Sequence, residues 1–171
     1  LMRRLFRQHQ LFFDLLWGMT EKELKARYKH TVFGFLWVVV NPLLQMLVIG
    51  FVFRFFIKEP IANYFPYLFT GLLVWTFFTL SLSKTTPAIV YERALIKKAK
   101  FPHAVIPLSI VLANAFNLVI ALLLLAVPTS FIGLLTFDRL IHLVMAFLLL
   151  IVFTSGLSFL TCALNVRFRD V

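Results

Sequence analysis

The sequence has little charge, a single cysteine and none of the common enzyme motifs. Asp, Glu, Lys and Arg together make up 14% of its 171 residues, well below the usual share in a soluble domain. The single cysteine, Cys162, excludes an internal disulfide and a cysteine metal cluster. There is no G-x-x-x-x-G-K-[ST] loop for ATP and no H-E-x-x-H metal motif. We therefore expect this chain to hold no catalytic residue, no metal and no cofactor.

Acidic residues are scarce, and their positions exclude further classes of function. The chain has seven of them, and none lies inside an apolar run. A proton-driven transporter, or a membrane hydrolase built on carboxylates, normally has at least one acid within a membrane span. The sequence therefore argues against both classes.

The sequence is rich in apolar residues and has a basic charge balance. Hydrophobic residues make up 61% of the chain, and the net charge is +10. The charges fall in the gaps between long apolar runs, which is the pattern of a membrane protein rather than of a nucleic-acid-binding face. The sequence predicts an all-α integral membrane protein with about four transmembrane helices. We place the spans at residues 32–57, 64–82, 105–127 and 140–163.

Residues 1–31 are predicted to form amphipathic helices that lie in the cytoplasmic headgroup layer. Gly18 is expected to end a first helix. Thr20, with Glu23 three residues later, forms a capping box that would begin a second helix over 21–30. The alternative is a solvated charged linker. Residues 32–171 are expected to form the transmembrane domain.

The segment 83–103 is the most polar internal stretch. Thr86, as a cap, and Pro87, at the first position, predict a helix over 88–100 that carries mostly basic residues. This helix either anchors to anionic lipid or docks on a cytoplasmic partner and transmits motion, and the residues alone do not decide between these roles. Residues 104–137 carry no charge and are too long for one span, so 128–137 is expected to be an outer loop or a partly re-entrant piece.

The distribution of basic residues predicts the orientation of the chain. Fourteen of the seventeen lysines and arginines lie in 1–31, 83–103 and 165–171, and the other three, Arg54, Lys58 and Arg139, lie at or near the opposite side. Basic loops stay in the cytoplasm. The N-terminus, the middle connection and the C-terminal tail are therefore predicted to be cytoplasmic.

Several amides and hydroxyls lie inside the predicted spans. They are Asn41, Gln45, Asn114, Asn117, Thr154, Ser155, Ser158 and Thr161. Two readings are open. Such groups hydrogen-bond between tightly packed helices, or they line a pathway for an uncharged or sugar-like substrate. For the second reading the candidates are Asn41, Gln45, Asn114, Asn117 and Ser158, with Trp75 as an aromatic that could stack on a sugar ring.

Six blocks, in order along the chain, resemble the permease subunits of ABC-2 type exporters, in particular those for O-antigen, capsular polysaccharide or teichoic acid. Residues 24–37 read LKARYKHTVFGFLW, similar to the family's K-x-R-Y-K/R-x-T-x-L-G-x-x-W with Phe33 in place of Leu. Pro42-Leu43-Leu44 and Phe51-Val52-Phe53 follow. Residues 67–75 read YLFTGLLVW, 95–102 read LIKKAKFP, and 165–171 read NVRFRDV.

The resemblance implies a half-transporter of the bacterial cytoplasmic membrane. Two copies would pair, two separate ATPase subunits would dock below them and bind ATP and Mg²⁺, and a glycan would pass between the copies. The residues that would couple to the ATPase are Glu92, Arg93, Lys97, Lys98, Lys100, Arg167, Arg169 and Asp170. The residues of the interface helix would be Lys25, Arg27, Tyr28 and Lys29.

The family pattern has six spans, whereas the predicted spans here number about four. We therefore expect the C-terminal part of the family pattern to be truncated, as a fragment, through a shortened gene or with the remaining spans supplied by another chain. Three alternative functions stay open beside glycan export. They are export of a drug or haem by a related permease, a membrane enzyme that processes glycolipids, and a scaffold that binds partners without transport.

Overall fold

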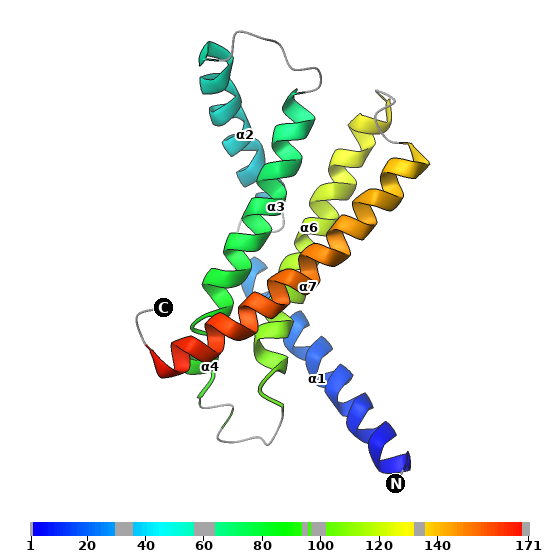
Figure 1. Cartoon of the computed structure of the whole chain (residues 1–171), viewed down its shortest axis with the longest axis vertical. Helices are drawn as coiled ribbons and strands as arrows, with labels where there is room; N and C mark the ends of the chain where they lie inside the picture. Colours follow the sequence, from blue (N-terminus) through cyan, green and yellow to red (C-terminus); the bar gives the residue numbers. More distant parts are fainter. Residues whose placement is uncertain are drawn as a thin grey trace.

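The residues that the structure describes are almost all helical. The computed structural model describes residues 2–29, 36–56, 64–93, 96, 102–131 and 136–168. Its helices are α1 (Met2–Tyr28), α2 (Trp37–Phe56), α3 (Tyr64–Thr85), α4 (Ala88–Tyr91), α6 (Val105–Phe131) and α7 (Phe137–Arg167). The predicted all-α class is confirmed. Figure 1 shows α2, α3, α6 and α7 running lengthwise, with α1 leaving one end of the bundle at an angle.

The helices α3, α6 and α7 contact one another pairwise and form the centre of the bundle. On α3 the inward side chains are Phe69, Leu73 and Phe77, which share a face because residues four apart lie one above the other on a helix. They pack against Val111 and Leu118 of α6 in one apolar cluster. Close contact between these helices therefore depends on shape, since lipid is as apolar as the side chains and supplies no hydrophobic drive between helices.

Three of the described helices, α3, α6 and α7, are long and apolar enough to cross a membrane, by length and composition. They correspond to the predicted spans 64–82, 105–127 and 140–163, and each extends a few residues beyond them. The fourth prediction, 32–57, contains α2, whose apolar stretch Leu43–Phe53 is shorter than those of the other three. A span at α2 therefore stays a prediction.

The predicted break in the N-terminal region is wrong, because α1 is one helix from Met2 to Tyr28. Gly18 lies inside it, with open space where a side chain would project. Thr20 does not cap a new helix. Its buried Oγ1 donates a hydrogen bond of 2.7 Å to the Leu16 carbonyl one turn earlier. The local stop and start signals lose to tertiary packing, because this part of α1 contacts α6.

The predicted cap at Thr86 is also wrong. Thr86 Oγ1 donates to the Leu82 carbonyl at 2.8 Å, so its hydroxyl closes the last turn of α3 and does not cap α4. Pro87 occupies the N-cap position of α4 and makes no side-chain cap bond. Of the predicted helix 88–100, the structure describes α4, Glu92, Arg93 and Ile96. The Ile96 N–H donates to the Glu92 carbonyl at 3.0 Å. The rest lies outside the described residues.

The predicted outer loop at 128–137 is partly helical. α6 continues through Pro128 to Phe131, and α7 begins at Phe137. Proline removes one backbone hydrogen bond from a helix, and this loss falls in the last two turns of α6. Thr136 then precedes α7 in an extended conformation.

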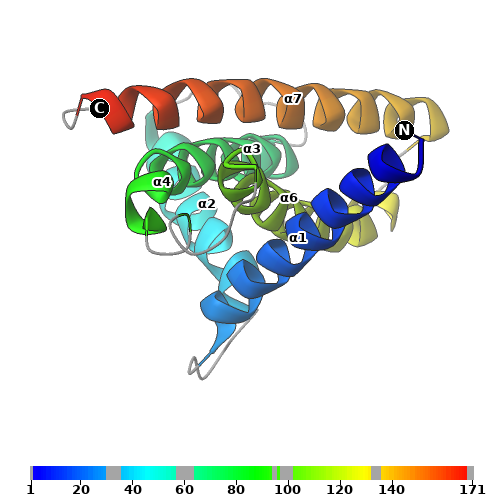
Figure 2. The same ribbon diagram turned by 90° about the horizontal axis from the view of Figure 1, so that it is seen from below.

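The elements predicted to be cytoplasmic gather at one end of the bundle, which we call the α4 end. The start of α6, the final turns of α7, α4 and α1 all lie there (Figure 1). Figure 2 shows this end from below, with α6 between α1 and α7.

Candidate functional site

At the α4 end, α1 docks on the bundle through an apolar contact. Met19 packs against a buried cluster of Ala88, Ile106 and Ile110, and Ile96 packs against the same cluster. Ala88 begins α4, whereas Ile106 and Ile110 belong to the first turns of α6. One methionine therefore contacts both helices. We call this contact, together with the ion pair described next, the α1 junction.

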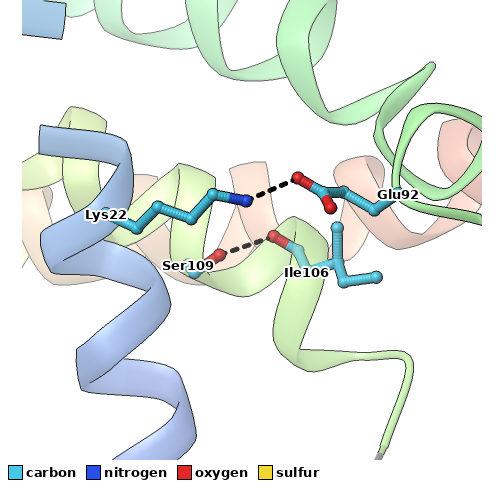
Figure 3. A network of polar contacts seen from close by, with 4 residues as sticks. All are labelled: Lys22, Glu92, Ile106 and Ser109. Carbon is cyan, nitrogen blue, oxygen red and sulfur yellow. Dashed lines mark hydrogen bonds and ion pairs between the residues drawn. The ribbon is translucent and has the colours of Figure 1, made fainter. Parts of the chain in front are cut away.

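An ion pair crosses the α1 junction. Lys22 Nζ lies 2.8 Å from Glu92 Oε1 at the end of α4 (Figure 3). Met19 and Lys22 are three residues apart and so share a face of α1, which means that the apolar contact and the ion pair hold the same face. Both side chains are partly exposed, and a pair of this kind contributes at most about 1 kcal/mol. The Lys22–Glu92 pair therefore adds little stability, and its main effect is to set how α1 is positioned against α4.

A basic residue of α3 also lies near the α1 junction. Lys84, in the last turn of α3, lies close enough to Arg27 and Glu23 of α1 for their charges to act on it. Below the ion pair, Ser109 Oγ donates to the Ile106 carbonyl at 2.8 Å within the first turns of α6 (Figure 3). The α1 junction thus joins α1, α4 and α6, and several basic side chains lie at it or near it. Such a surface suits an acidic partner surface or anionic lipid.

The structure places the predicted ATPase-coupling residues as follows. Glu92 forms the ion pair, and Arg93 is exposed beside it. Arg167 is exposed in the last turn of α7, with its guanidinium carbon 5.5 Å from the centroid of the Phe168 ring. The α7 and α4 helices contact each other, so Glu92 and Arg167 lie at the same end of the bundle. The remaining residues, Lys97, Lys98, Lys100, Arg169 and Asp170, lie outside the described residues.

The predicted interface-helix residues lie at the C-terminal end of α1. Lys25 is exposed and pairs with Glu21 one turn earlier, and Lys29 is exposed just beyond the helix. Arg27 is partly buried beside α3. The side chain of Tyr28 lies outside the described part of the chain.

The predicted pathway residues divide into a buried group and an exposed group. Asn114, Asn117 and Ser158 are buried. Asn41 and Gln45 are exposed on α2, and Trp75 is exposed on α3. Asn114 Nδ2 donates to Ser81 Oγ at 2.9 Å, which ties α6 to α3. Of the two readings of these polar groups, the buried side chains fit contact between helices, and the exposed ones face away from the bundle core.

Two residues of the site were not singled out from the sequence. Lys22 meets a partner 70 residues away, and no spacing rule connects positions so distant. Ser81 accepts the hydrogen bond from Asn114. A signal for Ser81 did exist, because it continues the four-residue series of Phe69, Leu73 and Phe77 on the buried face of α3.

Comparison with known proteins supplies the family. A model described as "ABC-2 type transporter" matches residues 14–171. The chain is similar to an O-antigen export system permease protein RfbA from Myxococcus xanthus, with 35% identity over 178 residues that cover 99% of this chain and 65% of that protein. It is also similar to an O-antigen export system permease protein RfbA from Klebsiella pneumoniae, with 34% identity covering 93% of this chain and 62% of that protein. The chain thus spans less than two thirds of the length of these relatives. On the family match over most of its length, the chain belongs to the ABC-2 type transporter family.

Proposed function

We propose that this chain forms the membrane part of an ABC exporter that moves a polysaccharide or lipid-linked glycan, with ATP hydrolysed by a separate subunit. The observation that carries the proposal is the similarity of nearly the whole chain to two O-antigen export permeases. The chain itself would supply spans and docking surfaces, and no residue in it would act as a catalyst.

We further propose that the α4 end faces the cytoplasm in a bacterial inner membrane. Support comes from two independent features. The basic segments of the sequence favour the cytoplasmic side, and the helices next to them, α1, α4 and the end of α7, lie at one end of the bundle (Figure 1). The membrane would then lie between this end and the opposite one, where α7 begins.

The α1 junction is the surface that we propose to transmit motion from the ATPase. The connection between α3 and α6 includes α4 and Glu92 and carries three lysines at 97–100. It is attached to α1 by Met19 and by the Lys22–Glu92 pair. A push on this connection would therefore move α1 together with the start of α6. Two copies of the chain, with their exposed apolar side chains against lipid and against each other, would enclose the pathway.

Co-purification with the ATPase encoded beside this chain tests the proposal. The intact chain and a variant with Lys97→Glu and Lys98→Glu are each expressed with the tagged ATPase and isolated in mild detergent. The expected result is recovery of the intact chain with the ATPase and loss of the variant, because two reversed charges repel the acidic surface that the basic segment would meet.

A matched control carries Arg54→Glu and Arg139→Glu, the same number of reversals at the predicted outer side. Its recovery should equal that of the intact chain. Surface display of the polysaccharide, measured in cells that lack their own export permease, then tests transport itself. Failure of the intact chain to bind the ATPase would count against the exporter, and the scaffold alternative would replace it.

A further inference from the structure

Four polar side chains lie in the interior between α3, α6 and α7, and we call them the polar cluster. They are Ser81, Asn114, Thr154 and Ser158, which are at most 2% exposed. One direct hydrogen bond joins members of the cluster, from Asn114 Nδ2 to Ser81 Oγ. Among the described residues α3 and α6 are thus linked within the cluster, whereas α7 contributes two hydroxyls without such a bond.

Three atoms of the polar cluster have no hydrogen-bond partner in the part of the chain that the structure describes. They are Asn114 Oδ1, Thr154 Oγ1 and Ser158 Oγ. Other hydroxyls in the bundle behave differently. Thr85 Oγ1 donates to the Ser81 carbonyl at 2.8 Å, and Ser155 Oγ donates to the Ile151 carbonyl at 2.7 Å. Hydroxyls in membrane helices commonly bond back to their own helix in this way, so Thr154 and Ser158 are exceptions.

Two contacts place α7 beside α3 and α4 around the polar cluster. The rings of Phe78 in α3 and Phe153 in α7 stack with centroids 6.1 Å apart. Farther along, the backbone of Ile89 in α4 lies close to the Cys162 thiol of α7. Thr154 and Ser158 lie between these two contacts and share their buried stripe with Cys162 at four-residue spacing. Asn114 is held at the same level by Ser81. The three unpartnered atoms therefore belong to one three-helix interior.

An unpartnered polar atom in such an interior is costly, because neither lipid nor packed apolar side chains replace its lost hydrogen bonds. Exchanging Nδ2 and Oδ1 of Asn114 by rotating the amide does not remove the problem. One of the two atoms can bond to Ser81, and the other then still lacks a hydrogen-bond partner. The missing partner must both donate, for the amide oxygen, and accept, for the hydroxyls. It must also be small and neutral, because all four members of the cluster are uncharged.

We propose that the polar cluster is a binding site for water, in which buried water bridges Asn114 of α6 to Thr154 and Ser158 of α7. A buried water makes two to four hydrogen bonds with otherwise unsatisfied polar groups, and the cluster offers three. Bridging water would replace the direct bonds that α7 lacks here. The contact of α7 with α6 would then be wet at the level of the polar cluster and dry around Leu118, where Leu150 and Ile151 of α7 pack against the apolar cluster. The proposal does not depend on transport.

The substitution Thr154→Val tests the site, because valine keeps the shape of threonine and removes the hydroxyl. The chain is purified in detergent, and its unfolding equilibrium is measured by titration with dodecyl sulfate. If water bridges Thr154, loss of the hydroxyl removes a hydrogen bond, and the equilibrium shifts toward the unfolded state by roughly three- to tenfold. The control Thr79→Val loses a hydroxyl that is exposed and bonded to the Trp75 carbonyl of its own helix, so it should change little.

The sign of the effect distinguishes the outcomes. A dry, unpartnered hydroxyl destabilises the folded state, so an increase in stability for Thr154→Val, or no change, would overturn the proposal. A double-mutant cycle of Thr154→Val with Asn114→Ala adds a second criterion. Shared water makes the second substitution cost less than the first, whereas strictly additive effects also count against the site. A third readout, needing no substitution, is magnetisation transfer from water to the backbone amides of Thr154 and Ser158 in lipid nanodiscs, which should be present there and absent at Leu118.

Discussion

The helices α6 and α7 are both long and apolar, yet the bundle uses them in opposite ways. In α6, 67% of the apolar, membrane-length part of the helix is buried inside the protein. In α7 the corresponding share is 11%. α6 lies between α1 and α7 (Figure 2), whereas α7 covers one side and exposes a row of large apolar side chains. Hydropathy therefore predicts that a helix enters the membrane and says little about whether protein or lipid surrounds it.

Small residues account for much of this difference. The buried face of α6 includes Ala113, Ala115 and Ala121, which allow neighbouring helices to approach closely. In α7 the buried face is a narrow stripe of Thr154, Ser158 and Cys162, and large exposed side chains such as Phe153 and Leu160 lie on other faces of the helix. Four measurements test this difference between the helices of the bundle.

The largest expected effect comes from removing a buried branched side chain of α6. Ile106→Ala should lower the free energy of unfolding by about 2–5 kcal/mol, because it leaves a cavity under Met19 of α1. Ile141→Ala makes the same chemical change on the exposed face of α7 and should cost far less. Denaturation curves in detergent measure both. Equal losses would show that α7 is as tightly packed as α6.

Overpacking gives the next effect. Ala113 is fully buried in α6, and Ala146 is exposed in α7. Ala113→Phe should destabilise the fold by about 1–3 kcal/mol, since a packed interior has no space for a ring. Ala146→Phe should be nearly neutral and so serves as the control. The thermal midpoint of the purified chain reports both, and a destabilising Ala146→Phe would indicate that a protein surface covers α7.

The direct link between α6 and α3 should have a smaller effect. Ser81→Ala removes the acceptor of the Asn114 amide and should cost about 0.5–2 kcal/mol, the range for hydrogen bonds between membrane helices. Ser83, two residues away on the same helix, is exposed and bonds to its own helix at the Leu80 carbonyl. Ser83→Ala should therefore leave the unfolding curve unchanged. A similar loss in both variants would mean that Asn114 gains nothing specific from Ser81.

The smallest effect on stability belongs to the α1 junction. Lys22→Gln should change the free energy of unfolding by less than about 1 kcal/mol, because the pair is partly exposed. Exchange of the two charges, with Lys22→Glu and Glu92→Lys together, should restore whatever each single reversal loses in ATPase-dependent transport. Without such recovery, the pair has no part in coupling.

The sequence predicted where helices occur better than where they end. Apolar runs placed α3, α6 and α7 within a few residues, because bilayer length and hydropathy act directly on the chain. The predicted helix end at Gly18 and the predicted caps at Thr20 and Thr86 were wrong, because such local signals are weak compared with tertiary packing. Thr20 is buried at the contact with α6, and both threonine hydroxyls bond to carbonyls one turn earlier. The prediction at Pro128 was wrong because α6 continues past this residue to Phe131, although proline removes one backbone hydrogen bond there.

The candidate site was less accessible to sequence reasoning. The basic character of 83–103 pointed to the connection between α3 and α6, and Glu92 was named within it. Its partner Lys22 became visible only once α1 was placed beside α4, because the ion pair depends on tertiary arrangement. The buried amides were noticed as polar residues in apolar runs. Which of them face the interior depends on helix rotation, and composition does not fix that rotation.

The continuity of α1 has a mechanical consequence. A helix of 27 residues is about 40 Å long, since each residue adds 1.5 Å. The α1 junction holds α1 at Met19 and Lys22, and the part of the helix before Met19 is about 26 Å long. A rotation of about 10° at the α1 junction would displace the start of the helix by about 4–5 Å. If the α1 junction transmits motion as proposed, an unbroken α1 would act as a rigid arm that enlarges small movements, whereas a flexible break at Gly18 would absorb them.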